Sequence, residues 1–164
     1  MEFQQIDRID EWEPGKFIQA HRLLRAEETI LKDHFPLFPV MPGVLMLEAC
    51  FQAGMWLVLA TDAFEHPLVT LQAARNVKYS DFVTPGQTLT VTMDVLKHEE
   101  QTTSFKAKGT VAGPDKESTV AFTARMVLER RHVADHYPLR AASEGAMRRG
   151  LRDLFEELTR SETN

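Results

Sequence analysis

The chain has 164 residues, of which 43% are hydrophobic and 26% charged, and its formal net charge is −5 at pH 7. This length and apolar content suffice for one domain with a buried core, whereas the acidic balance argues against nucleic-acid binding, which needs a strongly basic surface. The single cysteine, Cys50, excludes an internal disulfide, and no Cys/His cluster has the spacing of a zinc site.

The N-terminal segment, residues 1–16, is charged and lacks the apolar stretch of a signal peptide. We therefore expect a cytoplasmic protein. Lys16–Leu24 follows the turn-forming pair Pro14-Gly15 and reads as the first strand.

The most apolar segment of the chain runs from Pro42 to about Ala60 and predicts a helix that is hydrophobic on nearly all sides. A membrane span needs about 20 predominantly apolar residues with few or no charges. Here Glu48 and Gln52 interrupt the run and no basic residues flank it, so we expect a buried core helix and no membrane span.

Four further segments have the alternating pattern or the bounding turns of strands: Leu68–Tyr79, Thr88–Val95, Thr102–Val111 and Val120–Leu128. The last three are separated by short turn sequences, which is typical of an antiparallel meander. One long helix against one antiparallel sheet predicts an α+β fold.

The character of the sequence changes after Arg131, where a polar, turn-prone stretch leads into an amphipathic helix predicted over Met147–Thr159. We therefore divide the chain into a main domain, residues 1–131, and a C-terminal extension, residues 132–164. Docking of this helix on its own domain or on a partner subunit is favoured over a membrane surface, because its polar face carries several acidic residues.

The loop before the core helix is stiff, because Pro36, Pro39 and Pro42 fix the backbone at every third residue. Pro42 suits the first helical position, where a missing N–H costs nothing. Gly43 then offers a free backbone N–H at the positive end of the helix dipole, and it has no Cβ to keep a ligand carbonyl away. This geometry suits an oxygen that becomes negative during a reaction.

Glu48 lies about a turn and a half inside the helix, and Gln52, four residues later, shares its face and can hydrogen-bond to it. A carboxylate buried without a partner is costly, so such a group tends to keep its proton, as a general acid must. His34 supplies a complementary base. The alternatives are a packing histidine and a structural Glu–Gln contact, and Cys50 is expected to be a buried structural thiol.

The motifs HFP (34–36), PVMPG (39–43) and LMLEA (45–49), followed by Gln52 and by VTPGQ (83–87), resemble the signature of the 3-hydroxyacyl-[acyl-carrier-protein] dehydratases of the FabZ type. The resemblance extends at least from Arg8 to Arg131. It implies the hotdog fold, in which a curved antiparallel sheet of about five to six strands wraps a long central helix.

The resemblance also implies roles for individual residues. His34 matches the catalytic histidine and Glu48 the catalytic acid. Gly43 matches the glycine whose N–H binds the thioester carbonyl, and Val40 occupies the position whose carbonyl orients the histidine. Gln52 would support Glu48.

The implied reaction is dehydration of a 3-hydroxyacyl thioester to the trans-2-enoyl thioester, in fatty-acid or related lipid or polyketide biosynthesis. No cofactor is implied, because a phosphopantetheine arm on an acyl carrier protein or coenzyme A delivers the substrate. In this family the two catalytic residues come from opposite subunits, which implies a homodimer and leaves a trimer of dimers open.

Three residues depart from the family pattern. Asp33 replaces the usual glycine and places a second carboxylate beside His34, where an ionised form would favour the protonated histidine. Leu37 and Phe38 replace small and polar residues, so we expect them to shape the acyl tunnel together with Phe35 and Pro42.

Two other functions stay open at this point: a hotdog thioesterase that uses the carboxylate to activate water, and a non-catalytic acyl-binding or assembly subunit. An acidic carrier protein would need a basic docking patch. The candidates for that patch in the sequence are Arg22, Arg25, Lys78, Arg130 and Arg131.

Overall fold

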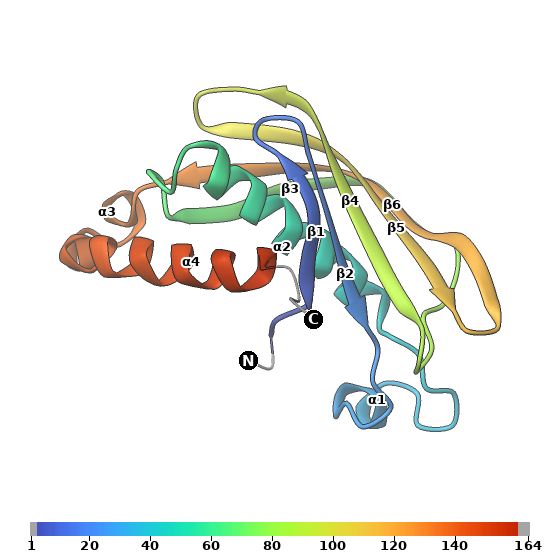
Figure 1. The fold of residues 1–164 in the computed structure, drawn as a ribbon. Helices are drawn as coiled ribbons and strands as arrows, with labels where there is room; N and C mark the ends of the chain where they lie inside the picture. Colours follow the sequence, from blue (N-terminus) through green and yellow to red (C-terminus); the bar gives the residue numbers. More distant parts are fainter. Residues whose placement is uncertain (1–2, 161–164) are drawn as a thin grey trace.

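The computed structural model describes residues 3–160, which form one curved sheet wrapped around one long helix (Figure 1). The strands are β1 (Arg8–Glu13), β2 (Phe17–Leu23), β3 (Leu68–Tyr79), β4 (Thr88–His98), β5 (Thr102–Gly113) and β6 (Lys116–Arg131). The helices are α1 (Ile30–Asp33), α2 (Gly43–Thr61), α3 (Val133–His136), the 3-10 helix η1 (Pro138–Ser143) and α4 (Glu144–Thr159).

The sheet has six strands in the order β1-β2-β4-β5-β6-β3, and every neighbouring pair is antiparallel. The predicted α+β architecture and the meander β4-β5-β6 are confirmed. Strand β1 was not predicted as a separate element, because RIDEWE is mostly charged and a register shift between Ile9 and Glu11 breaks its alternation.

Helix α2 is the core of the domain and contacts all six strands. The alternating residues Leu89, Val91 and Met93 of β4 face it and are at most 1% exposed. The close approach of helix and sheet depends on Gly54, where an added Cβ would lie 3.0 Å from Met93 Cε and 3.2 Å from Leu128 Cδ2.

By length and composition alone, α2 could also cross a membrane, and half of the relevant window is buried. Its packing against every strand is that of a core helix. The helix is left uncovered at its N-terminal end, where Val44 is 62% exposed, and the neighbouring edge strand β3 exposes Leu71 and Val77.

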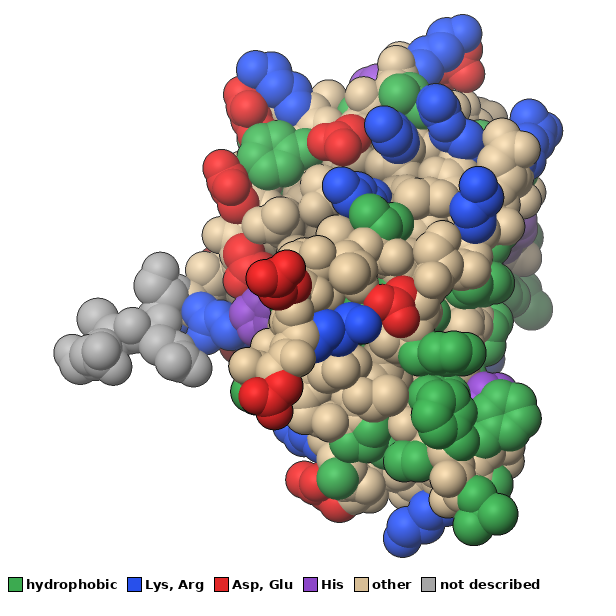
Figure 2. Space-filling view, turned by 90° about the vertical axis from the view of Figure 1, so that its right-hand side faces the viewer, with side chains coloured by type: hydrophobic (Ala, Val, Ile, Leu, Met, Phe, Trp, Pro, Cys, Tyr) green, Lys and Arg blue, Asp and Glu red, His purple; other side chains and the backbone are tan. Residues whose placement is uncertain are grey.

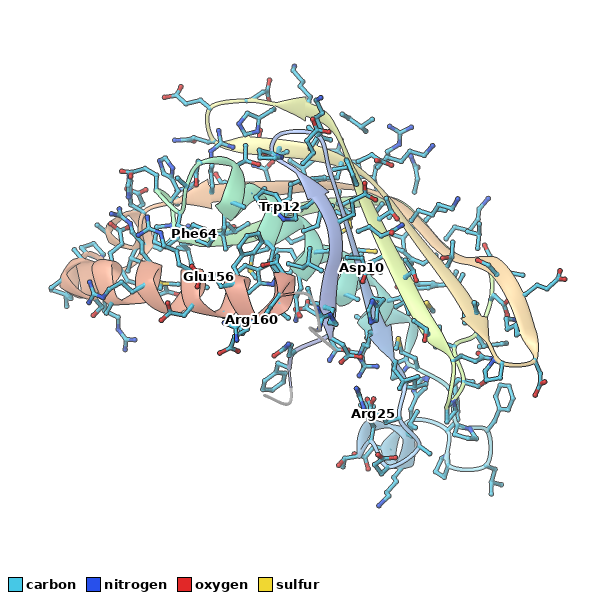
Figure 3. All side chains as sticks on the ribbon, viewed as in Figure 1. Asp10, Trp12, Arg25, Phe64, Glu156 and Arg160 are labelled. Atoms are coloured by element: carbon cyan, nitrogen blue, oxygen red, sulfur yellow. The ribbon has the colours of Figure 1, made fainter. Side chains whose placement is uncertain are left out.

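The C-terminal extension folds back over the open side of the sheet, and α4 contacts β1 (Figure 1). Phe155 enters an aromatic cluster with Trp12, Trp56 and Phe64, with ring centroids 5.1, 5.9 and 5.8 Å from its own. Figure 3 shows Trp12 and Phe64 lying between the ribbon of α4 and the rest of the domain. Of the two arrangements that the sequence left open, its own domain or a partner subunit, α4 docks on its own domain.

Two arginines of α4 also hold the turn that follows α2. Arg148 and Arg152 each donate a hydrogen bond of 3.0 Å to a backbone carbonyl, of Glu65 and Ala63 respectively. In this turn Ala63 and Phe64 adopt positive φ values of 55° and 63°, which side chains with a Cβ disfavour. The extension therefore stabilises a strained connection of the main domain.

Candidate functional site

His34 lies at the end of the short helix α1, and its backbone N–H donates to the carbonyl of Ile30 at 3.2 Å. The side chain is exposed, and its ring packs against that of Phe35 with centroids 4.2 Å apart. The sequence predicted the histidine but not α1, which spans only four residues. His34 is the C-cap residue of this short helix, and its imidazole lies at the surface of the single chain.

The loop between His34 and α2 exposes large apolar side chains. Phe35 and Phe38 are each 53% exposed and Leu37 is fully exposed, and residues 35–38 line a concavity of about 400 Å³. Phe38 also packs edge-on against Phe82 of the β3–β4 connection, with centroids 5.5 Å apart. Phe38 therefore holds the middle of the loop to the β3–β4 connection, while Phe35 and Leu37 are open to a ligand or a partner.

The end of this loop is firmly anchored. Met41 donates from its backbone N–H to the carbonyl of Val83 at 2.9 Å, and both Met41 and Pro42 are buried. Pro42 is the N-cap residue rather than the first helical residue, and α2 begins at Gly43. Because the first N–H groups of a helix have no partner within it, the N–H of Gly43 remains an available donor.

Tyr79 covers Gly43 and was not identified from the sequence. A Cβ added at Gly43 would lie 2.9 Å from Tyr79 Cε1, so the aromatic ring packs directly on this glycine. The ring also contacts that of Phe122, with centroids 5.4 Å apart. Burial and, to a lesser degree, charge interaction with Cys50 raise the pKa of Tyr79, so the phenol keeps its proton and its ability to donate.

Glu48 and Gln52 meet on one face of α2 as predicted, with Gln52 Nε2 donating to Glu48 Oε1 at 3.0 Å. Glu48 is half-buried in the single chain rather than enclosed by apolar side chains, because this face of the helix is not covered by the sheet. Cys50 is fully buried, as expected of a structural thiol, and burial raises its pKa.

His34 and Glu48 are not joined within one chain. Among residues 3–160 no hydrogen bond or ion pair links them, and none links the His34 ring to the carbonyl of Val40 or to Asp33. Asp33 lines a different concavity, of about 640 Å³, between residues 3–5, α1 and Leu45. The roles inferred for these residues remain predictions.

The predicted basic docking patch is not formed by the residues proposed for it. Arg22 is buried and paired with Glu28 at 2.6 Å, and Arg25 lies 3.3 Å from Asp7. Arg130 is also buried and donates to the carbonyls of Glu99 and Glu100, and Arg131 pairs with Glu129 at 2.6 Å. Of the candidates only Lys78 has a side chain that forms no ion pair or hydrogen bond in the part of the chain that the structure describes.

Within residues 3–160, no group of three His, Cys, Asp or Glu side chains is placed to hold a metal ion. The groups that the candidate site offers are the side chains of His34, Glu48, Gln52 and Tyr79 and the backbone N–H of Gly43.

A family model described as the FabA-like domain matches residues 1–122. The 3-hydroxyacyl-[acyl-carrier-protein] dehydratase FabZ of Clostridium kluyveri is 37% identical over 95 residues, which cover 58% of this chain and 66% of that protein, just under two thirds of its length. The protein of the same name from Latilactobacillus sakei is 34% identical over 118 residues, covering 72% of this chain and 84% of the relative.

Solved structures confirm the hotdog fold. The dehydratase heterocomplex ApeI:P from Xenorhabdus doucetiae superposes with a TM-score of 0.66 at 17% identity, covering 84% of this chain and 90% of that one. A mutant of the thioesterase PA1618 from Pseudomonas aeruginosa gives 0.57 at 12% identity, covering 76% and 80%. At such identities these likenesses show the fold alone, whereas the family match extends over most of the sequence: the chain belongs to the FabA-like domain family.

Proposed function

We propose that the protein dehydrates 3-hydroxyacyl thioesters to trans-2-enoyl thioesters, releasing water. The observation that carries this proposal is helix α2. It presents a free N–H at Gly43 and, about 7.5 Å further along its axis, a carboxyl group held by Gln52. The curated relatives that match this region are named as 3-hydroxyacyl-[acyl-carrier-protein] dehydratases, which supports the same reaction.

In the proposed mechanism the neutral imidazole of His34 removes a proton from C2 of the substrate. The electrons move into the thioester carbonyl. Its oxygen becomes negative and accepts a hydrogen bond from the N–H of Gly43. Protonated Glu48 donates its proton to the C3 hydroxyl, which leaves as water while the C2–C3 double bond forms. The reaction is neutral overall, with the proton gained by His34 balancing the one lost by Glu48.

His34 would act with Glu48 of a second copy of the chain. Two observations support a homodimer. Strand β3 is a 12-residue edge strand that pairs only with β6 within the part of the chain that the structure describes, and an edge of that length is usually covered. Exposed apolar side chains also lie along it and beside it, namely Leu71, Val77, Tyr79, Val44, Phe82, Phe35, Leu37 and Phe38.

The outer face of the sheet carries a basic surface to which an acidic carrier protein would bind. Arg75, Lys78, Lys106, Lys108 and Arg125 are all exposed there, and none takes part in an ion pair among the described residues. The register places Arg125 opposite both Arg75 and Lys106. Figure 2 shows this face, with Lys and Arg side chains gathered over its upper half and hydrophobic ones at its lower right.

This basic surface stands out against a formal net charge of −5 for the whole chain. Asp94, in register with Lys106, marks its border on β4. Lys78 directly precedes Tyr79, whose side chain covers Gly43 from the inner face, so the basic surface lies on the opposite face of the sheet at the end of β3 that is nearest the candidate site. We propose it as the docking surface in place of the arginines suggested by the sequence.

The reaction is tested with purified protein and 3-hydroxyacyl thioesters of several chain lengths, linked to carrier protein or to coenzyme A. We expect the enoyl absorbance to appear with the wild type, and His34→Ala and Glu48→Gln each to lower kcat by at least about a hundredfold. Gln101→Ala, at an exposed turn, serves as a control and should leave the rate unchanged.

Wild-type protein that produces no enoyl thioester from any of these substrates would contradict the proposal. Release of free thiol from saturated acyl thioesters would instead indicate a thioesterase. Tight acyl-thioester binding without turnover would indicate a non-catalytic subunit.

The docking surface is tested by the double charge reversal Lys106→Glu with Arg125→Glu. We expect KM for a carrier-linked substrate to rise by about tenfold or more, because like charges would then face the acidic carrier. KM for the same acyl group on N-acetylcysteamine should not change. Arg149→Glu, on the exposed side of α4, is the matched control, and an equal effect of that variant would contradict the assignment.

A further inference from the structure

The side-chain amide of Gln52 is bound at both ends by the N-terminal segment of the chain, residues 3–5. Its Oε1 accepts the backbone N–H of Gln5 at 2.7 Å, and its Nε2 donates to the backbone carbonyl of Phe3, also at 2.7 Å. One partner is a pure donor and the other a pure acceptor, so the amide has a single orientation. It pairs with the segment as a neighbouring strand would.

This orientation determines what Glu48 receives. With one Nε2 hydrogen directed to Phe3, the other is donated to Glu48 Oε1 at 3.0 Å. A flipped amide would present its oxygen to the carboxyl group instead, and would place its NH2 group against the N–H of Gln5.

A neutral carboxyl group has one O–H donor and one carbonyl oxygen that accepts. An N–H group directed at Oε1 makes this atom the accepting oxygen, because a proton on Oε1 would meet the hydrogen of Gln52. The proton of neutral Glu48 is therefore held on Oε2, the oxygen that Gln52 leaves free.

The N-terminal segment is anchored well enough to impose this arrangement. Gln5 and Ile6 are only 4% and 1% exposed, and Asp7 donates from its backbone N–H to the carbonyl of His21 at 2.8 Å, leading into β1. Phe3 is 77% exposed, so the bond from Gln5 is the better anchored of the two.

We propose that residues 3–5 are a positioning element of the site: their backbone fixes the amide of Gln52, which keeps the proton of Glu48 on Oε2, facing the departing hydroxyl. The proposal rests on the proposed function for its effect on rate. The contact between the segment and Gln52 can be tested without it.

The first measurement is the exchange of the Gln52 side-chain NH2 protons with solvent, followed by NMR in the wild type. We expect both protons to be protected, with shifts resolved from those of surface glutamines such as Gln101. Gln5→Pro removes the backbone N–H and should expose these protons, whereas Gln5→Ala keeps the N–H and should not. Exchange as fast as that of Gln101 in the wild type would overturn the proposal, even if no turnover had been found.

The second measurement is steady-state kinetics of the same variants. Gln5→Pro should lower kcat by about tenfold with KM unchanged, and Gln5→Ala should retain the wild-type kcat. Gln52→Glu keeps an acceptor for the N–H of Gln5 but replaces the NH2 group that serves Phe3 and Glu48 with an oxygen, so it should lower both kcat and the melting temperature. Full kcat in Gln52→Glu, or in folded Gln5→Pro with exposed Gln52 protons, would overturn the proposal.

Discussion

Gly43 combines two requirements in one residue. It begins α2, where its N–H has no partner within the helix, and it allows the ring of Tyr79 to lie against its Cα. Any side chain at this position would either displace Tyr79 or stand in the space that a thioester carbonyl has to enter. The candidate site thus requires a residue without a Cβ at position 43.

Gly43→Ala should lower both activity and stability. The added Cβ would lie 2.9 Å from Tyr79 Cε1, so we expect a loss of about 1–3 kcal/mol in the free energy of unfolding and a marked rise in KM. Gly150→Ala in α4 is the matched control, since nothing lies within 4 Å of its Cβ and alanine favours a helix by about 0.5–1 kcal/mol. Chemical denaturation and turnover measure both effects, and a Gly43→Ala protein as stable and active as the wild type would contradict this view.

At the scale of single residues, the sequence predicted contacts that depend on helical spacing but not those that depend on strand register. The bond between Gln52 and Glu48 follows from a spacing of four residues within one helix. The contact of Tyr79 with Gly43 depends on how β3 pairs with β6, where Tyr79 lies opposite Phe122. The partners of Gln52 in residues 3–5 were likewise hidden, because they are backbone groups.

At the scale of elements, the long helix and the long strands were predicted and the short elements were not. The predicted strand Leu68–Tyr79 has the observed bounds of β3, and the predicted helix from Pro42 to Ala60 differs from α2 by one residue at each end. Elements of four to six residues, such as α1 and β1, were missed because an element this short has too few positions to show a periodic pattern. Helix α4 begins at Glu144, before the amphipathic pattern becomes clear at Met147.

The docking of α4 on the main domain should depend on Phe155. This side chain is 9% exposed and lies within the aromatic cluster of Trp12, Trp56 and Phe64, so Phe155→Ala should cost about 3–5 kcal/mol. Leu139→Ala, at a fully exposed position in η1, should change stability by less than about 0.5 kcal/mol. Guanidinium denaturation and limited proteolysis of the extension would compare them, and equal behaviour of the two variants would show that α4 is not held in this way.

At the scale of the whole molecule, the described chain leaves several apolar regions uncovered. The open edge of β3, the exposed N-terminal end of α2 and the apolar loop after His34 carry the uncovered hydrophobic side chains named above. His34 and Glu48 also lack a contact with each other within the chain, although the sequence motif contains both. The sequence alone does not show what covers a helix that is apolar on all sides. Burial by a sheet and burial by a second subunit require the same apolar residues on the helix.

The most direct test of the central claim is complementation between two inactive variants. His34→Ala and Glu48→Gln, each without activity alone, are unfolded together, refolded as an equal mixture and assayed for dehydration of a 3-hydroxyacyl thioester. If each site takes His34 from one copy and Glu48 from the other, the mixture should recover about a quarter of the wild-type activity, since half of the dimers are mixed and each has one intact site. A mixture that forms dimers and stays inactive would contradict the shared site, and wild-type protein without dehydratase activity would contradict the proposed function itself.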